Sequence, residues 1–182
     1  MLATAGAGTA LADTPSGGAT FVPPPPPPEK ATLVDGKVIA PASAPTRIKR
    51  VIAAANRIVE KPYIYGGGHK LYKKVAGVVR LDRGYDCSGA VSFALAAADL
   101  LETPLDSGSF MSWGAAGRGD WITVYANPGH AYVVIAGLRL DTSTAGVSRV
   151  GRMPAGARES GPRWRPVLRS PRGYVRRHPI SF

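Results

Sequence analysis

The sequence predicts an α+β domain in which two helices come first and an antiparallel sheet follows. Apolar residues recur at helical spacing between Thr46 and Val59. A second run, from Cys87 to Leu101, is apolar on nearly every face, which is typical of a buried helix. Residues 121–142 consist of β-favouring runs separated by turn residues. Helices followed by neighbouring strands indicate the α+β class.

The first predicted helix is amphipathic. Thr46 is expected to be its N-cap, because a threonine hydroxyl can accept a backbone hydrogen bond in the first turn, and Pro62 is expected to end it. Basic residues lie mostly on the face opposite the apolar one. The apolar positions are Ile48, Val51, Ile52, Ala55, Ile58 and Val59.

The second predicted helix begins at Cys87, the only cysteine in the chain. Asp86 can cap this helix by accepting a hydrogen bond from a first-turn N–H. At such a position the unpaired N–H groups and the helix dipole favour a thiolate, so Cys87 is a candidate nucleophile. The alternative is a small buried hydrophobic residue, a common role for free cysteines. The local sequence leaves both open.

The strands after residue 120 offer partners for a nucleophile. His130 follows the turn Pro128–Gly129 and begins a predicted strand, and a tight turn at Ala136–Gly137 would lead into the next. This register places Asp141 opposite Tyr132 and on the same face as His130. A thiol, an imidazole and a carboxylate in this order can form a thioester and hydrolyse it. The alternative is that His130 and Asp141 are ordinary turn residues.

Composition limits the classes of protein and of site. The chain has 182 residues, a net charge of +11 and a pI near 10.2, with residues 146–182 alone carrying +8. Such a surface attracts polyanions: nucleic acid, an anionic membrane or an anionic cell wall. One cysteine excludes an intramolecular disulfide and a cysteine-based zinc site, and the three histidines show no metal-ligand spacing. We therefore expect no cofactor and no metal. No apolar run is long enough to cross a membrane.

The amino-terminal quarter of the chain is expected to precede the folded domain. Residues 1–12 end in Ala10-Leu11-Ala12, which is similar to a signal-peptide cleavage site, so they are interpreted as a possible signal-peptide remnant, with a disordered terminus as the alternative. Residues 13–45 include six consecutive prolines and are predicted to be a Pro-rich disordered linker. The domain is predicted to occupy residues 46–182, with a basic C-terminal segment.

Three motifs resemble a known family. The stretches Pro62–Gly67 (PYIYGG), Tyr85–Gly89 (YDCSG) and Gly129–His130 before an apolar strand are similar to those of the NlpC-type cell-wall cysteine peptidases, bacterial relatives of the papain superfamily. The Asp-Cys-Ser-Gly element at the start of a helix is the most specific of the three. The resemblance runs from about Thr46 to Asp141.

The resemblance implies a papain-like fold and a function. It implies a cysteine endopeptidase that hydrolyses peptide stems of peptidoglycan, commonly between D-glutamate and diaminopimelate, with Cys87 and His130 as catalytic residues. The third position, often His in the family, corresponds to Asp141. By the same analogy Tyr63, Asp86 and Ser88 line the cleft, and the Cys87 N–H contributes to an oxyanion hole, with the Tyr63 hydroxyl as a second donor.

Two alternatives stay open at this stage. The same residues could serve an acyltransferase or an amidase acting on another substrate, or the chain could be a non-catalytic basic module that binds the wall. No nucleic-acid-binding motif accompanies the charge, so we expect no nucleic-acid partner. The expected protein is a secreted monomer in the cell wall, whose partners are peptidoglycan stem peptides and anionic wall polymers.

Overall fold

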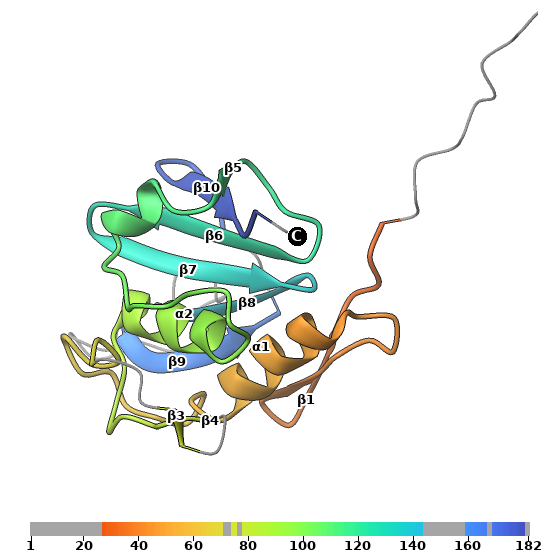
Figure 1. Ribbon diagram of the computed structural model, residues 1–182, viewed down its shortest axis with the longest axis horizontal. Helices are drawn as coiled ribbons and strands as arrows, with labels where there is room; N and C mark the ends of the chain where they lie inside the picture. The colour runs from red at the N-terminus through yellow and green to blue at the C-terminus, as the bar shows by residue number, and fades with distance from the viewer. Residues whose placement is uncertain (1–26, 71–73, 76–77, 144–158, 167–168, 181–182) are drawn as a thin grey trace, which may run out of the picture.

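The computed structural model describes residues 27–70, 74–75, 78–143, 159–166 and 169–180 (Figure 1). Within these ranges the chain forms helices α1 (Thr46–Asn56) and α2 (Cys87–Ala96), and a short 3-10 helix, η1 (Ser109–Met111). None of these helices is long and apolar enough to traverse a bilayer. Helix α2 contacts α1 and also strands of the main sheet, so the two helices and the sheet enclose one core (Figure 1).

The main sheet is antiparallel, and its strands run in the spatial order β5-β10-β6-β7-β8-β9. Two further hairpins, β1 with β2 and β3 with β4, lie outside it. Two helices packed on an antiparallel sheet confirm the predicted α+β class. The strands are β1 (Thr32–Val34), β2 (Lys37–Ile39), β3 (Lys74–Val75), β4 (Val78–Val79), β5 (Ala115–Ala116), β6 (Ile122–Asn127), β7 (His130–Ile135), β8 (Leu138–Ser143), β9 (Glu159–Arg165) and β10 (Val175–His178).

The β6-β7-β8 meander has the predicted register. Asn127 pairs with His130 across the first turn, and the Asn127 side chain accepts hydrogen bonds from the N–H groups of Gly129 and His130. The second turn consists of Ala136 and Gly137, both with positive φ, the conformation that matches the twist of a two-residue hairpin. Val133 then pairs with Leu140, so the next position along β8, Asp141, lies opposite Tyr132 as predicted.

Helix boundaries differ from the prediction at three ends. The N-cap of α1 is Pro45, with no side-chain hydrogen bond, and Thr46 is the first helical residue. A proline there has the fixed φ that a helix start requires and no N–H of its own to satisfy. The helix ends at Asn56, and residues 57–60 form turns before Pro62. Helix α2 ends at Ala96 rather than near Leu101.

Part of the predicted linker is folded. Strands β1 and β2 lie inside residues 13–45, and the side chains of Ala31 and Val38 are buried in the core. The Asn56 side chain fixes this hairpin, since it accepts from the Val38 N–H and donates to the Val38 carbonyl. The linker prediction is therefore wrong over residues 27–45. A few alternating apolar side chains are enough to form a folded hairpin when they can pack against helix α1. Residues 13–26 and the predicted signal remnant lie outside the described residues.

Strand β9 was not predicted from the sequence. It contains Gly161 and Pro162, residues that favour turns, and it is an edge strand of the main sheet. Edge strands tolerate proline because one side of their backbone needs no ladder partner. Strand β10 pairs with β6 and β5 at the other end of the sheet.

Candidate active site

Cys87 is the first residue of α2 and is partly buried. The predicted cap is confirmed: the Asp86 carboxylate accepts a hydrogen bond of 2.7 Å from the Gly89 N–H. All other residues of α2 are buried, so the helix cannot rotate about its axis without exposing apolar surface. The cap and the packing together hold the thiol at the amino end of the helix.

The glycine turn before the helix is packed against it. Gly67 accepts a hydrogen bond from the Asp86 N–H, and a Cβ on Gly89 would collide with the Gly67 carbonyl oxygen. A Cβ on Gly67 would in turn collide with the carbonyl of Gly84. The two motifs, Pro62–Gly67 and Tyr85–Gly89, are therefore halves of one close backbone contact. The glycines are required by this contact rather than by chain flexibility.

Tyr63 enters the site through the backbone. It forms a parallel bridge with Tyr85, supported by hydrogen bonds from Tyr85 N to the Pro62 carbonyl and from Ile64 N to the Tyr85 carbonyl. Tyr63 is partly buried. The bridge places Tyr63 beside Tyr85, which lies two positions before Cys87 in the segment that leads into α2.

His130, the first residue of β7, joins the helix to the sheet. Its Nε2 atom lies 2.8 Å from Oδ1 of Asp141, and its ring also forms a hydrogen bond with the Cys87 side chain. Burial lowers the pKa of His130, but the bonds to Asp141 and Cys87 outweigh it and raise the pKa to about 9. The imidazole is therefore held as a cation between two acidic partners.

Asp141 lies on β8, and its side chain is fully buried. The Oδ1 atom accepts from His130 and, at 2.9 Å, from the N–H of Ser143. The pairing of β8 with β9 shifts between Asp141 and Ser143, a bulge-like irregularity of the kind that re-aims a side chain. The Oδ2 atom lies 3.4 Å from the guanidinium groups of both Arg139 and Arg169. Both oxygens of the carboxylate are thus engaged.

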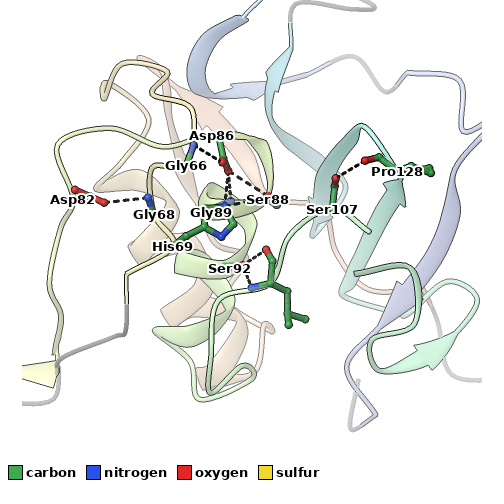
Figure 2. Close-up of polar contacts among 11 residues, drawn as sticks. Gly66, Gly68, His69, Asp82, Asp86, Ser88, Gly89, Ser92, Ser107 and Pro128 are labelled. Atoms are coloured by element: carbon green, nitrogen blue, oxygen red, sulfur yellow. Dashed lines mark hydrogen bonds and ion pairs between the residues drawn. The ribbon is translucent and has the colours of Figure 1, made fainter. Parts of the chain in front are cut away.

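A second imidazole, that of His69, lies beside Asp86 and Ser88 at the helix start (Figure 2). His69 Nε2 is 2.9 Å from Asp86 Oδ1 and 3.3 Å from the hydroxyl of Ser88. The bond to Asp86 is the main cause of a raised pKa for His69, with burial opposing it. Burial raises the pKa of Asp86, but bonds from His69 and Gly89 outweigh it and lower the pKa. Asp86 and Ser88 are therefore held by His69.

The loop after α2 is tied to the turn that carries His130. The Ser92 hydroxyl pairs with both the N–H and the carbonyl of Leu105, and the Ser107 hydroxyl donates to the Pro128 carbonyl at 3.2 Å (Figure 2). Pro128 precedes His130 by two residues. Helix, loop and strand are thereby linked around the site by side chains that the sequence alone did not single out.

The structure brings the predicted residues into two adjoining groups. One contains Cys87, His130 and Asp141, and the other contains Asp86 and Ser88 together with His69. Arg169 belongs to the first group and was not predicted individually, because its distance along the chain and its place among many arginines give no local signal. Across the described ranges, no three His, Cys, Asp or Glu side chains gather closely enough to hold a metal ion.

The arrangement has the elements of nucleophilic catalysis. A thiol at a helix start contacts an imidazole that is oriented by a buried carboxylate, which is the geometry needed to transfer a proton from sulfur and to return it to a leaving group. The Cys87 N–H, as the first in its helix, has no acceptor within the helix and can stabilise a developing oxyanion.

Comparisons with known proteins gave matches only among solved structures. No family model and no curated protein matches the chain. Two mutated forms of the Resuscitation Promoting Factor Interacting protein RipA are similar at 22% and 23% identity, both with a TM-score of 0.46. These similarities cover 84% and 72% of this chain, and 69% and 62% of the RipA chains. A hypothetical invasion protein of Mycobacterium tuberculosis is similar at 21% identity with a TM-score of 0.47, over 84% of this chain and 69% of that one.

Proposed function

We propose that the chain is a cysteine endopeptidase that hydrolyses the peptide stems of bacterial peptidoglycan, with the bond between D-glutamate and diaminopimelate as the expected site of cleavage. The observation that carries the proposal is the position of His130, which hydrogen-bonds both to the Cys87 side chain and to the buried Asp141. The substrate class comes from the resemblance of the PYIYGG, YDCSG and Gly-His motifs to NlpC-type peptidases.

The proposed reaction begins from an ion pair, in which the proton of the Cys87 thiol already resides on the His130 imidazole. The sulfur attacks the carbonyl carbon of the scissile amide, and the C–S bond forms as negative charge moves to the carbonyl oxygen. His130 then donates its proton to the amide nitrogen, the C–N bond breaks, and the amine leaves. A water molecule, deprotonated by His130, hydrolyses the thioester and regenerates the thiol.

The remaining residues stabilise this sequence. Asp141 holds the His130 ring in one orientation and balances the charge of the imidazolium. The Cys87 N–H, with the Tyr63 hydroxyl as a second donor, faces the developing oxyanion. Asp86 and Ser88 flank the nucleophile and line the cleft on the side of the glycine turn. No cofactor is needed for any step.

The proposed setting is the cell wall. The proposed chemistry uses the single thiol of the chain and needs no disulfide. The excess of arginine in residues 146–182 favours binding to anionic wall polymers and acidic stem peptides. We propose a secreted protein that acts as a monomer, without nucleic-acid partners.

The test is digestion of purified peptidoglycan by the wild type and by Cys87→Ala, with the released fragments identified by mass. Cleavage at this bond gives one fragment that ends in D-glutamate and another that begins with diaminopimelate. Release of both fragments by the wild type alone supports the proposal. Cys87→Ser is a matched control, because it keeps the shape and polarity of the side chain but is a much weaker nucleophile under the same His130.

Other outcomes point to the alternatives. Products in which an acyl group has moved to an added amine indicate a transferase, and cleavage at another amide revises the bond. If peptidoglycan is not cleaved but binds both the wild type and Cys87→Ala in a pull-down, the chain is a wall-binding module. That result contradicts the proposed activity.

A further inference from the structure

Four cationic groups surround the carboxylate of Asp141. Asp141 gives one oxygen to His130, and its other oxygen lies 3.4 Å from Nε of Arg139 and 3.4 Å from Nη1 of Arg169. Arg165 on β9 also interacts electrostatically with Asp141. The side chains of Arg139 and Asp141 are completely buried, so the screening by water that weakens surface ion pairs is largely missing here.

Arg169 differs from the other two arginines in how it is held. Its guanidinium lies 5.3 Å from the ring centre of Tyr132 and 5.2 Å from that of Tyr174, while the two rings meet edge to face. A planar cation between two aromatic faces is well oriented and partly shielded from water. Tyr174 also meets the His130 ring edge-on, with 6.4 Å between ring centres. Arg169 is therefore fixed by residues that also touch the imidazole.

Residues 169 and 174 belong to the connection that leads into β10, far along the chain from Cys87. This connection provides a cation to the second oxygen of Asp141 and an aromatic edge to the His130 ring. An arginine that served only as a solvated surface charge would not need this position, because water solvates a guanidinium equally well elsewhere on the surface. The placement indicates a role toward the His130–Asp141 pair.

We propose that Arg169 is a positioning residue for the His130–Asp141 pair. Its guanidinium holds Oδ2 of Asp141 and, as a second cation near the same carboxylate, lowers the proton affinity of the His130 imidazole. Asp141 alone, with the thiolate of Cys87, would stabilise imidazolium so strongly that His130 would be a poor proton donor. A second cation on the same carboxylate opposes that stabilisation, because like charges near one site disfavour one another.

In the described part of the chain, several groups face the His130 ring or its partner Asp141. Cys87 comes from α2, Asp141 and Arg139 come from β8, Tyr132 comes from β7, and Tyr174 comes from the connection before β10. Arg139 contacts the same oxygen of Asp141 as Arg169 and remains in place when Arg169 is replaced, as does the Ser143 N–H on the other oxygen. The carboxylate therefore keeps two other partners in an Arg169 variant, so the titration of His130 reports mainly the loss of the Arg169 charge.

The experiment is an NMR titration of the His130 imidazole in the full chain, with the resonance assigned from its loss in His130→Gln. Arg169→Met keeps a long apolar side chain between the two tyrosines and removes the charge. The midpoint for His130 should move upward by on the order of one pH unit. Arg169→Lys keeps the charge and should restore the wild-type midpoint, although it loses the planar stack. Arg172→Met removes an exposed charge from the same connection and should leave the midpoint unchanged.

An unchanged or lowered midpoint in Arg169→Met, in a variant whose thermal unfolding is still cooperative, overturns the proposal. If Arg169→Met does not fold, Arg169→Gln removes the same charge with a side chain that can still donate to Asp141, and the same upward shift is expected. The inference rests on the proposed function only for its consequence in catalysis. The titration follows a ring resonance and gives its answer even if peptidoglycan is not the substrate.

Discussion

Nε2 of His130, on β7, lies 2.8 Å from Oδ1 of Asp141, on the neighbouring strand β8. The register of the two strands puts both side chains on the same face of the sheet. The same ring interacts with the Cys87 side chain, so one imidazole joins the helix to the sheet. The predictions below depend on this single ring and on the backbone that presents its partners.

Replacing Asp141 by Asn should impair catalysis, and it should also destabilise the fold because it removes the charge that faces the buried Arg139. An amide of the same shape can still accept a hydrogen bond, but it loses the negative charge that stabilises the imidazolium and can hold the ring in the wrong tautomer. We expect kcat for peptidoglycan cleavage to fall by about 10²-fold or more. Asp120→Asn, which neutralises an exposed carboxylate before β6, is the matched control and should retain wild-type activity. Equal activity in Asp141→Asn would exclude an orienting role.

Iodoacetamide should alkylate Cys87 rapidly below about pH 7. The proposed mechanism pairs a thiolate with the His130 cation, and a thiolate reacts with iodoacetamide far faster than a thiol does. In His130→Ala the rate near pH 6 should fall by roughly 10- to 100-fold. Because the chain has one cysteine, the mass of the intact protein reports the reaction directly. A wild-type rate that rises only above about pH 8, as for a free thiol, would contradict the proposed nucleophile.

The stability of the fold should decrease as the pH rises through the titration of His130. The pKa is raised to about 9 in the folded state, against an ordinary value near 6.5, so the protonated ring stabilises the fold. This contribution is complete below about pH 6.5 and is lost as the pH approaches and passes about 9. It amounts to on the order of 2–3 kcal/mol. Urea unfolding of the wild type and of His130→Gln across this range measures it.

His69 also has a raised pKa and titrates in the same direction, so it must be separated from His130. The variant His69→Gln serves this purpose, because it removes only the contribution of the pair with Asp86. A difference between wild type and His130→Gln that does not change with pH would show that the His130 cation adds nothing to the fold.

Gly89→Ala should be severely destabilising although it adds one methyl group to a helix. The new Cβ would meet the carbonyl oxygen of Gly67, a backbone atom that cannot move without breaking its hydrogen bond from Asp86. We expect a loss of about 3 kcal/mol or more in the free energy of unfolding, the size of an overpacking defect. Gly129→Ala is the control, since its Cβ would meet only the Asn127 side chain at 3.9 Å. Comparable stability of the two variants would contradict the close contact.

The elements that depend on local pattern were predictable. The Asp86 cap, the buried character of α2 and the β6-β7-β8 meander all follow from residues close together in the chain, and each is confirmed. Strand β9 and the β1-β2 hairpin were missed. In both, turn-forming or scattered apolar residues gave a weak local signal, and packing against α1 or β8 decided the outcome.

The site shows the same division. Cys87, His130 and Asp141 could be nominated because a helix start and a strand register fix where each side chain points. His69 and Arg169 could not, because their partners lie 17 and 28 residues away and no periodicity relates them. The roles assigned to Tyr63, Asp86 and Ser88 remain proposals that rest on the family resemblance.

The sequence by itself determined the order of helix and strands and the residue types that could carry the chemistry, because hydrophobic periodicity, caps and turn residues act over a few positions. Only the tertiary structure decided which charges surround Asp141 and what holds Asp86. Those contacts join segments whose approach depends on how the whole core packs. The electrostatic environment of the imidazole is therefore a property of the assembled fold, and a short motif does not encode it.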